Sequence, residues 1–209
     1  RQALLIYVYE DGCYRLYSND MLMGRIKQYI ADYDEELVKM GQVSETLNHI
    51  VTDLNYVTQD DLNDNEDLIN FSNGLLRVTE DVLQLFPHSP DVLSTIQIPC
   101  EWKGAPTPTP VFDSYIRTLT NGDKAIEQLL LEFIGACISN VKGSRMKKSL
   151  FLVGNGDTGK SQLKSLVERL LGRENFIGID LKDIEARFGT GAIYGTRLAG
   201  SSDMSFLSV

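Results

Sequence analysis

Residues 149–161 read SLFLVGNGDTGKS, and this stretch decides the fold of the second half of the chain. Its last eight residues fit the pattern G-x-x-x-x-G-K-[ST] at every fixed position. The apolar run 149–153 predicts a strand before the glycine-rich turn, and the amphipathic segment 162–171 predicts a helix after it. Strand, loop and helix in this order are typical of the opening of a parallel α/β domain that binds phosphate.

Each fixed position of this loop has a chemical reason. The glycines allow a sharp turn, so that successive backbone N–H groups and the start of the next helix face the same anion. Lys160 is expected to reach the β- and γ-phosphates and to act in catalysis, and the Ser161 hydroxyl is expected to ligate Mg²⁺. The sequence therefore predicts ATP and Mg²⁺ as ligands; the alternative is a glycine-rich turn with an incidental lysine. The predicted nucleotide-binding residues are Gly154, Asn155, Gly156, Asp157, Thr158, Gly159, Lys160 and Ser161.

Such a site also needs a carboxylate on a neighbouring strand to hold Mg²⁺ or its water. Asp203 follows a predicted strand over residues 196–202 and is the best candidate for this metal-binding and catalytic role. Asp180, Asp183 and Glu185 lie in or beside a predicted short helix after a strand at residues 176–179. The segment 199–202 is less apolar than a buried strand, so an ordinary strand-end aspartate remains the alternative.

The first half of the chain predicts an α+β region over residues 1–104. Asp11-Gly12 is a hairpin signal between strands 3–9 and 13–17. A helix with Met21, Ile26, Tyr29 and Ile30 on one face follows, capped by Ser18, Asn19 or Asp20, and a second is predicted over 45–57 with Ser44 as its cap. After an acidic turn at 59–67, short strands are predicted at 68–71, 75–78, 82–86 and 94–99.

Residues 105–110 read APTPTP, a stiff, extended connection, and predict a domain boundary. Residues 111–209 are then a helical lead-in followed by the first part of the phosphate-binding domain. Helices are predicted at 111–119 and 123–139. The second is expected to place Ile126, Leu129, Leu130, Phe133 and Ile134 on one side.

Composition excludes some classes of function. Cys13, Cys100 and Cys137 form no CxxC pair, which argues against a zinc site or a disulfide framework. The chain has no apolar stretch near the roughly 20 residues that a membrane span needs, so no membrane partner is expected. His49 and His88 have no clustered partner and are interpreted as structural or solvated. Trp102 is expected to pack at the domain boundary; stacking on a base is the alternative.

The charge is distributed unevenly. Residues 1–140 hold nine basic and 22 acidic side chains, a net charge of −13, whereas residues 141–209 hold 11 basic and seven acidic ones, a net of +4. An acidic surface repels a phosphate backbone, so any contact with nucleic acid is expected in the last third, and only weakly.

Four segments resemble the C-terminal half of phage and plasmid primase–helicases, relatives of the poxvirus primase–helicase in helicase superfamily III. They are YVYEDGCYRLY at 7–17, INFSNGLLRVTEDVLQLFPHSPDVLSTIQIPCEW at 69–102, residues 132–135 with 149–161, and IEARFGTGAIYGTRLAGSSD at 184–203. The loop at 154–161 is shared by many nucleotide hydrolases, whereas the block 69–102 points to this family. The resemblance thus places the chain, from its first strand to Asp203, in this family.

The resemblance implies a mixed α/β fold whose second part is an AAA+-like P-loop NTPase. It implies an ATP-dependent helicase for phage or plasmid DNA replication in the cytoplasm of a bacterial host cell, which acts on single-stranded or forked DNA as a homo-oligomer, usually a hexameric ring. Lys160 and Ser161 would contact ATP–Mg²⁺ and Asp203 would be the Walker B acid. Thr158 stands where relatives often have Asn, and the single acid Asp203 replaces an acidic pair.

The resemblance also sets expectations about what the chain holds. The sequence starts at Arg1 rather than Met, which suggests a fragment of a longer protein. The resemblance implies that the family's sensor asparagine, DNA-binding hairpin and arginine finger lie beyond Val209. Without an arginine at the γ-phosphate, slow hydrolysis is expected. Two other readings stay open: a nucleotide-binding module for oligomerisation or a partner, without turnover, and a P-loop kinase or transferase of another family.

Overall fold

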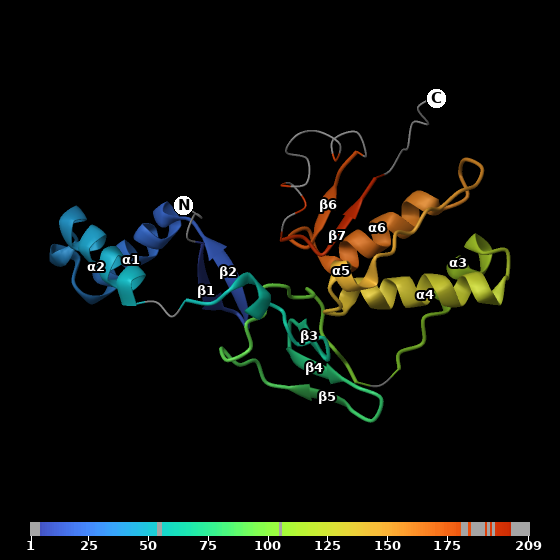
Figure 1. Ribbon diagram of the computed structural model, residues 1–209, viewed down its shortest axis with the longest axis horizontal. Helices are drawn as coiled ribbons and strands as arrows, with labels where there is room; N and C mark the ends of the chain where they lie inside the picture. Colours follow the sequence, from blue (N-terminus) through green and yellow to red (C-terminus); the bar gives the residue numbers. More distant parts are fainter. Residues whose placement is uncertain are drawn as a thin grey trace.

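The computed structural model describes residues 5–53, 56–104, 106–180, 184, 191, 193 and 195–201. Asp183, Glu185 and Asp203 therefore lie outside the described residues. The fold is mixed α/β, as predicted, with short strands and helices in three regions (Figure 1). No helix among the described residues is long and apolar enough to span a bilayer.

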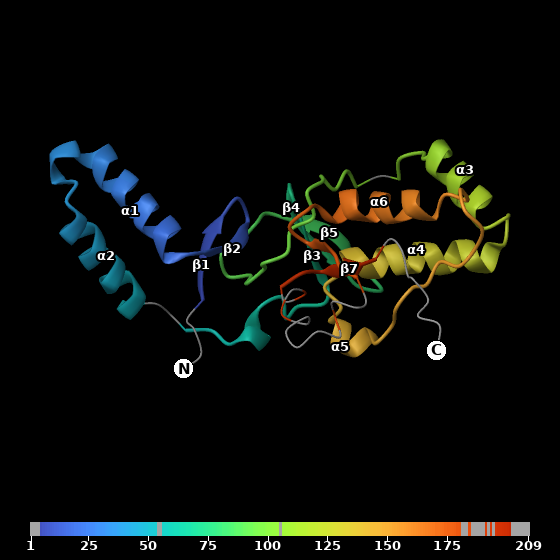
Figure 2. The same cartoon turned by 90° about the horizontal axis from the view of Figure 1, so that it is seen from above.

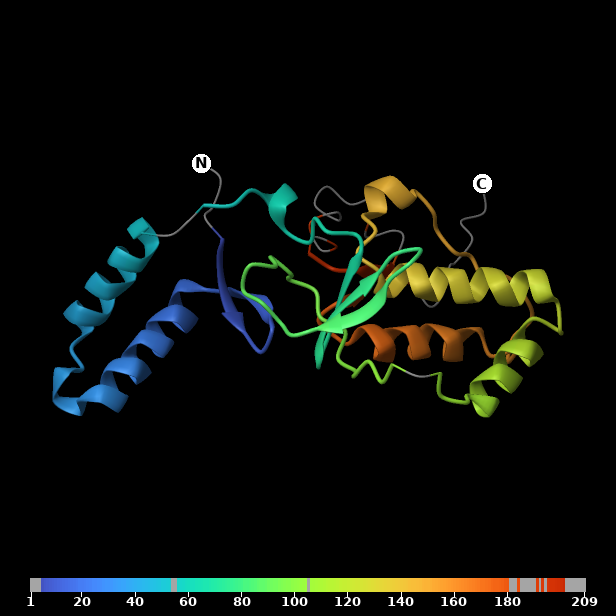
Figure 3. The same cartoon turned by 90° about the horizontal axis from the view of Figure 1, so that it is seen from below.

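The chain begins with an antiparallel hairpin and a projecting pair of helices (Figure 3). β1 (Ile6–Glu10) pairs with β2 (Cys13–Tyr17), and φ is positive at both turn residues, +49° at Asp11 and +80° at Gly12. This geometry confirms the Asp-Gly hairpin turn. The helices are α1 (Asn19–Tyr33) and α2 (Met40–Asp53), joined by the 3-10 turn η1 (Glu35–Leu37).

The structure corrects two details of these helices. Ser18 caps α1 by accepting a hydrogen bond from the Met21 N–H, as predicted, but the buried stripe is Leu22 and Ile26, and Met21 and Tyr29 are exposed. The face against β1 and α2 is thus shifted from the predicted one, and it also includes the half-buried Met23 and Ile30. The predicted Ser44 cap is wrong, because α2 begins at Met40. Burial of Val43 in the same cluster as Leu22 extends this helix toward its N-terminus.

A three-stranded antiparallel sheet forms the middle of the molecule. After the 3-10 turn η2 (Gln59–Asp61), β3 (Leu68–Phe71), β4 (Gly74–Val78) and β5 (Leu83–Phe86) pair in order, which confirms three of the four predicted strands. The fourth, at 94–99, is wrong: it makes one isolated bridge, between Phe71 and Ile98. Instead, Ser94 Oγ accepts a hydrogen bond from Asn70 Nδ2 of β3, and Gln97 Nε2 donates to the Asp11 carbonyl oxygen in the first hairpin.

In its described residues, the last region contains helices packed beside a parallel pair of strands. The helices are α3 (Pro110–Leu119), α4 (Lys124–Ile138), α5 (Gly143–Met146) and α6 (Lys160–Leu171), and α4 and α6 lie side by side (Figure 2). β6 (Phe176–Gly178) pairs in parallel with β7 (Leu198–Gly200), so both strands expected after the loop are present. On α4, Leu130 is buried and Phe133 and Ile134 are half-buried. Ile126 and Leu129 share that side of the continuous helix, as predicted, but they are exposed because the apolar contacts cover only its C-terminal part.

The predicted strand at 149–153 does not form. Residues 149–153 have no regular secondary structure, and Phe151 and Val153 are 61% and 89% exposed. A strand needs a neighbour that pairs with its backbone, and residues 149–153 have no ladder partner in the described part of the chain. Their apolar pattern predicted a strand, but the pairing that a strand needs depends on neighbouring segments and not on the pattern.

The packing of α6 places the start of this helix. One cluster joins Leu76 of β4 and Ile98 to Cys137, Val167 and Leu171, so it draws on residues before and after 105–110. A second cluster joins Leu163 to Ile116 of α3 and Leu130 of α4. Helix α6 is therefore fixed along its length between the central sheet and helices α3 and α4. The predicted domain boundary at 105–110 stays a prediction.

Candidate phosphate-binding site

The loop 154–161 ends where α6 begins. Helix α6 starts at Lys160, two residues earlier than predicted, and Gly159 precedes it with φ +92°, a conformation that side chains rarely adopt. The Tyr115 hydroxyl of α3 donates to the Gly159 carbonyl oxygen at 2.9 Å, and an added Cβ on Gly159 would come within 3.3 Å of the Tyr115 ring. Glycine is thus required both by the turn and by the close approach of α3.

The Lys160 ammonium lies within its own loop. Its Nζ donates to the Gly154 carbonyl oxygen at 3.1 Å, to the Asn155 carbonyl oxygen, and to Thr158 Oγ1 at 3.0 Å. Thr158 Oγ1 in turn donates to the Asn155 carbonyl oxygen at 3.1 Å. A phosphate that binds here competes with three loop oxygens for one cation, and its greater charge favours the phosphate.

The rest of the loop suits an anion. An added Cβ on Gly156 would meet no atom within 4 Å, and Ser161 is exposed on the first turn of α6. The loop is thus open at Gly156, and the first backbone N–H groups of a helix, which have no intrahelical partner, attract negative charge. The exposed Ser161 hydroxyl adds an oxygen of the kind that Mg²⁺ prefers. Backbone N–H donors, a lysine and a hydroxyl are the kinds of group that could hold a phosphate chain and its metal ion.

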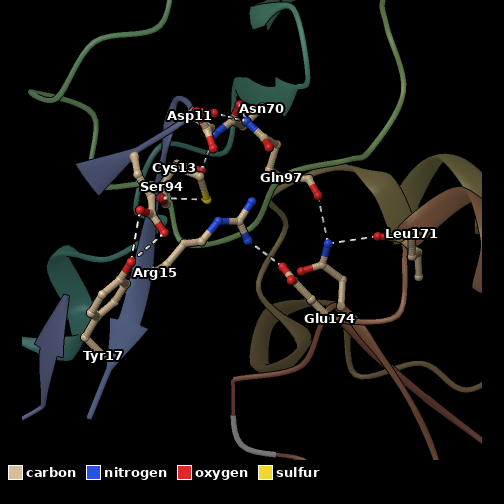
Figure 4. A network of polar contacts seen from close by, with 11 residues as sticks. Asp11, Cys13, Arg15, Tyr17, Asn70, Ser94, Gln97, Leu171 and Glu174 are labelled. Carbon is tan, nitrogen blue, oxygen red and sulfur yellow. Dashed lines mark hydrogen bonds and ion pairs between the residues drawn. The ribbon is translucent and has the colours of Figure 1, made fainter. Parts of the chain in front are cut away.

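The far end of α6 is held by a polar junction (Figure 4). The buried Asn175 side chain donates to the carbonyl oxygens of Leu171 and Gln97, each at 2.8 Å. The Asn175 carbonyl oxygen accepts from the N–H groups of Arg197 and Leu198, at the start of β7. One residue thus ties the C-terminal end of α6 to the segment after the central sheet and to the parallel strands.

Of the candidate carboxylates for the predicted metal site, the structure describes Asp180. Asp203 lies outside the described residues. Asp180 follows β6, is exposed, and accepts a 3.4 Å hydrogen bond from Ser201 after β7. The carboxyl ends of the two parallel strands therefore meet. Asp203 stays a prediction as the Walker B acid.

Two residues of this region, Arg197 and Tyr115, have structural roles that the sequence analysis did not identify. Arg197 donates from Nε and Nη2 to the carbonyl oxygens of Cys137 and Ala136, at the C-terminal end of α4, where a cation complements the helix dipole. Tyr115 gave no signal, because its partner lies 44 positions away; burial raises the pKa of this phenol.

His88 and His49 were interpreted as structural or solvated, and their positions agree with this. His88 contacts Asn70 and the Phe71 carbonyl oxygen through Nε2, and His49 is exposed. Trp102 packs on the central cluster, 5.8 Å from the Phe71 ring centre, and its place at a domain boundary stays a prediction. All three cysteines are free, and the described residues contain no cluster of His, Cys, Asp and Glu suited to a metal ion.

Comparison with known proteins extends this picture to the N-terminal half. The family model described as D5 N terminal like matches residues 3–121, which include the first hairpin, the helical arm, the central sheet and α3. The phosphate loop lies after the matched segment. No curated protein matches the chain. Because the match covers more than half of its residues, the chain belongs to the D5 N terminal like family, the N-terminal domain of D5-type primase–helicase proteins of phages and poxviruses.

Proposed function

We propose that this chain binds ATP–Mg²⁺ through residues 154–161 and is part of an ATP-dependent DNA helicase of the primase–helicase type. One observation carries the proposal: a complete G-x-x-x-x-G-K-S loop turns at positive φ on Gly159 and opens into a fixed helix at Lys160. Family membership supports a role in DNA replication.

The proposed binding follows from charge and geometry. The N-terminus of α6 offers backbone donors and a partial positive charge, and Lys160 adds a full one. Ser161 supplies one oxygen to Mg²⁺, and Asp203 is proposed as the acid that holds the metal or its water. In the complete enzyme, a homo-oligomeric ring, a hexamer by resemblance, would move along single-stranded or forked DNA. The AAA+-like parallel sheet belongs to the same proposal.

A second candidate is a nucleotide-binding module that assembles with partners and does not turn over ATP by itself. It is favoured by Arg197, whose guanidinium is occupied by two α4 carbonyl oxygens rather than directed at the loop. A steady-state phosphate-release assay separates the two candidates. Turnover near 1 s⁻¹, within the usual range for enzymes of about 1–10³ s⁻¹, would reject the second one.

Calorimetric titration of Mg-ATP tests the binding site. We expect Lys160→Ala to weaken ATP binding by at least about tenfold, or roughly 1.4 kcal/mol, because the variant loses the cation that faces the phosphates. Stability should change little, since the hydrogen bonds of the Lys160 ammonium to described residues all lie within its own loop. Lys148→Ala, an exposed lysine before the loop, is the matched control and should bind normally. Equal affinity in the Lys160 and Lys148 variants would remove the assignment.

A further inference from the structure

The arm formed by α1, η1 and α2 ends in an exposed apolar surface. Tyr29 and Tyr33 are 82% and 85% exposed, and Leu37 and Met40 lie beside them in sequence at 40% and 61%. Residues 29–40, called the arm tip here, are farthest from the central sheet, and the arm extends away from it (Figure 2). Several exposed apolar side chains close together in sequence at such a position are typical of an interaction site.

The arm is held firmly behind this tip. Leu22 and Ile26 of α1 pack with Val43 and Leu47 of α2 and with Ile6 of β1. The hairpin is bonded in turn to the central region, through Tyr14 N–H to the Ser94 carbonyl oxygen at 2.8 Å and Asn70 Nδ2 to the Gly12 carbonyl oxygen at 2.8 Å. A helix pair anchored in this way presents its tyrosines without a large ordering cost on binding.

The negative charge of the arm tip indicates the chemical class of its partner. Asp32, Asp34, Glu35 and Glu36 are all exposed there, and Lys39 is the one basic side chain among residues 29–40. A nucleic acid would be repelled by this surface. A protein segment with lysine or arginine around apolar side chains matches it in both charge and polarity.

We propose that the arm tip is a docking site for a basic amphipathic segment of a partner protein. Tyr29 and Tyr33 would lie against the apolar side chains of that segment, since tyrosine buries a large area with few rotatable bonds and is frequent among the residues that dominate binding energy. The carboxylates of Glu35 and Glu36 would face its basic side chains. This proposal is independent of the phosphate loop.

A synthetic peptide provides the test. The probe is a fluorescently labelled helical peptide of about five turns with leucine on one face and lysine on the other, titrated with the whole chain and followed by anisotropy. We expect the double variant Tyr29→Ala, Tyr33→Ala to weaken binding by at least about tenfold, and Glu35→Lys with Glu36→Lys to weaken it too. Tyr56→Ala, an exposed tyrosine outside the arm tip, is the matched control and should have no effect.

Three outcomes would overturn the proposal. A peptide with glutamate in place of lysine could bind equally well, the tyrosine double variant could retain full affinity, or sedimentation could show self-association that the double variant abolishes, which would make a second copy the occupant. Loss of folding does not confuse the result, because both tyrosines are exposed and thermal unfolding of the double variant should match the parent.

Discussion

At the scale of single residues, Tyr115 supports the phosphate loop from outside it. Its hydroxyl fixes the Gly159 carbonyl oxygen, which also accepts from the N–H groups of Gln162 and Leu163 in the first turn of α6. We expect Tyr115→Phe to cost about 0.5–1.5 kcal/mol of stability and to weaken Mg-ATP and inorganic tripolyphosphate to the same degree, because the effect acts through the loop. Tyr33→Phe, at an exposed position, is the control. Loss of ATP binding alone would instead place Tyr115 against the base.

A second residue-scale prediction concerns alkaline pH. Burial in the central cluster raises the pKa of the Cys137 thiol from 9.0 to about 11, and the nearby Arg197 only partly opposes this. Between pH 9 and 11 the unfolded chain loses this proton while the folded chain keeps it, so stability falls as the pH rises through this window. The slope should stay below the limit of about 1.4 kcal/mol per pH unit for one group. Cys137→Ala should unfold with a shallower dependence in denaturant titrations; an identical slope would contradict the assignment.

At the scale of elements, local signals predicted what local forces determine. The Asp11-Gly12 turn, the Ser18 cap and the strands at Leu68–Phe71 and Phe176–Gly178 all follow from residues within a few positions. Long-range contacts explain the failures. Burial of Val43 extends α2 past Ser44, and residues 149–153 lack a pairing neighbour among the described residues. The contact between Tyr115 and Gly159 could not be predicted, since no periodicity carries it.

The junction at Asn175 provides the element-scale test. We expect Asn175→Ala to destabilise the fold by about 1–3 kcal/mol, because the buried carbonyl oxygens of Leu171 and Gln97 lose their donor. Asn48→Ala, on the exposed side of α2, should change stability by less than about 0.5 kcal/mol. Chemical denaturation of both variants measures the difference. A neutral Asn175→Ala would mean that α6 is held by its apolar contacts alone.

For the whole molecule, the packing of α6 joins the two halves of the chain. The C-terminal half of α6 belongs to the same apolar cluster as the central sheet, and its first turn lies against α3 and α4. Arg15 of β2 adds an ion pair to Glu174, just beyond α6 (Figure 4). This pair is exposed and contributes little energy. The apolar cluster therefore accounts for most of the energy that holds α6 to the central sheet. The position of loop 154–161 thus depends on residues of the matched segment 3–121 as well as on its own motif.

The charge of the whole chain leads to the last prediction, for DNA. The net charge of −13 over residues 1–140 opposes a phosphate backbone, and the +4 of residues 141–209 is small. We expect weak binding of single-stranded DNA that falls steeply with salt, because the attraction comes from released counterions and only a few phosphates can be neutralised. Anisotropy with a labelled oligothymidine at about 50 and 200 mM salt measures both quantities. Lys147→Ala with Lys148→Ala should reduce the salt slope, whereas the tyrosine pair of the arm tip should not affect it. Sub-micromolar affinity at physiological salt would contradict this prediction. Neither the net negative charge of residues 1–140 nor the small positive charge of residues 141–209 can supply that affinity, so the chain would have to contain a DNA site that its charge distribution does not indicate.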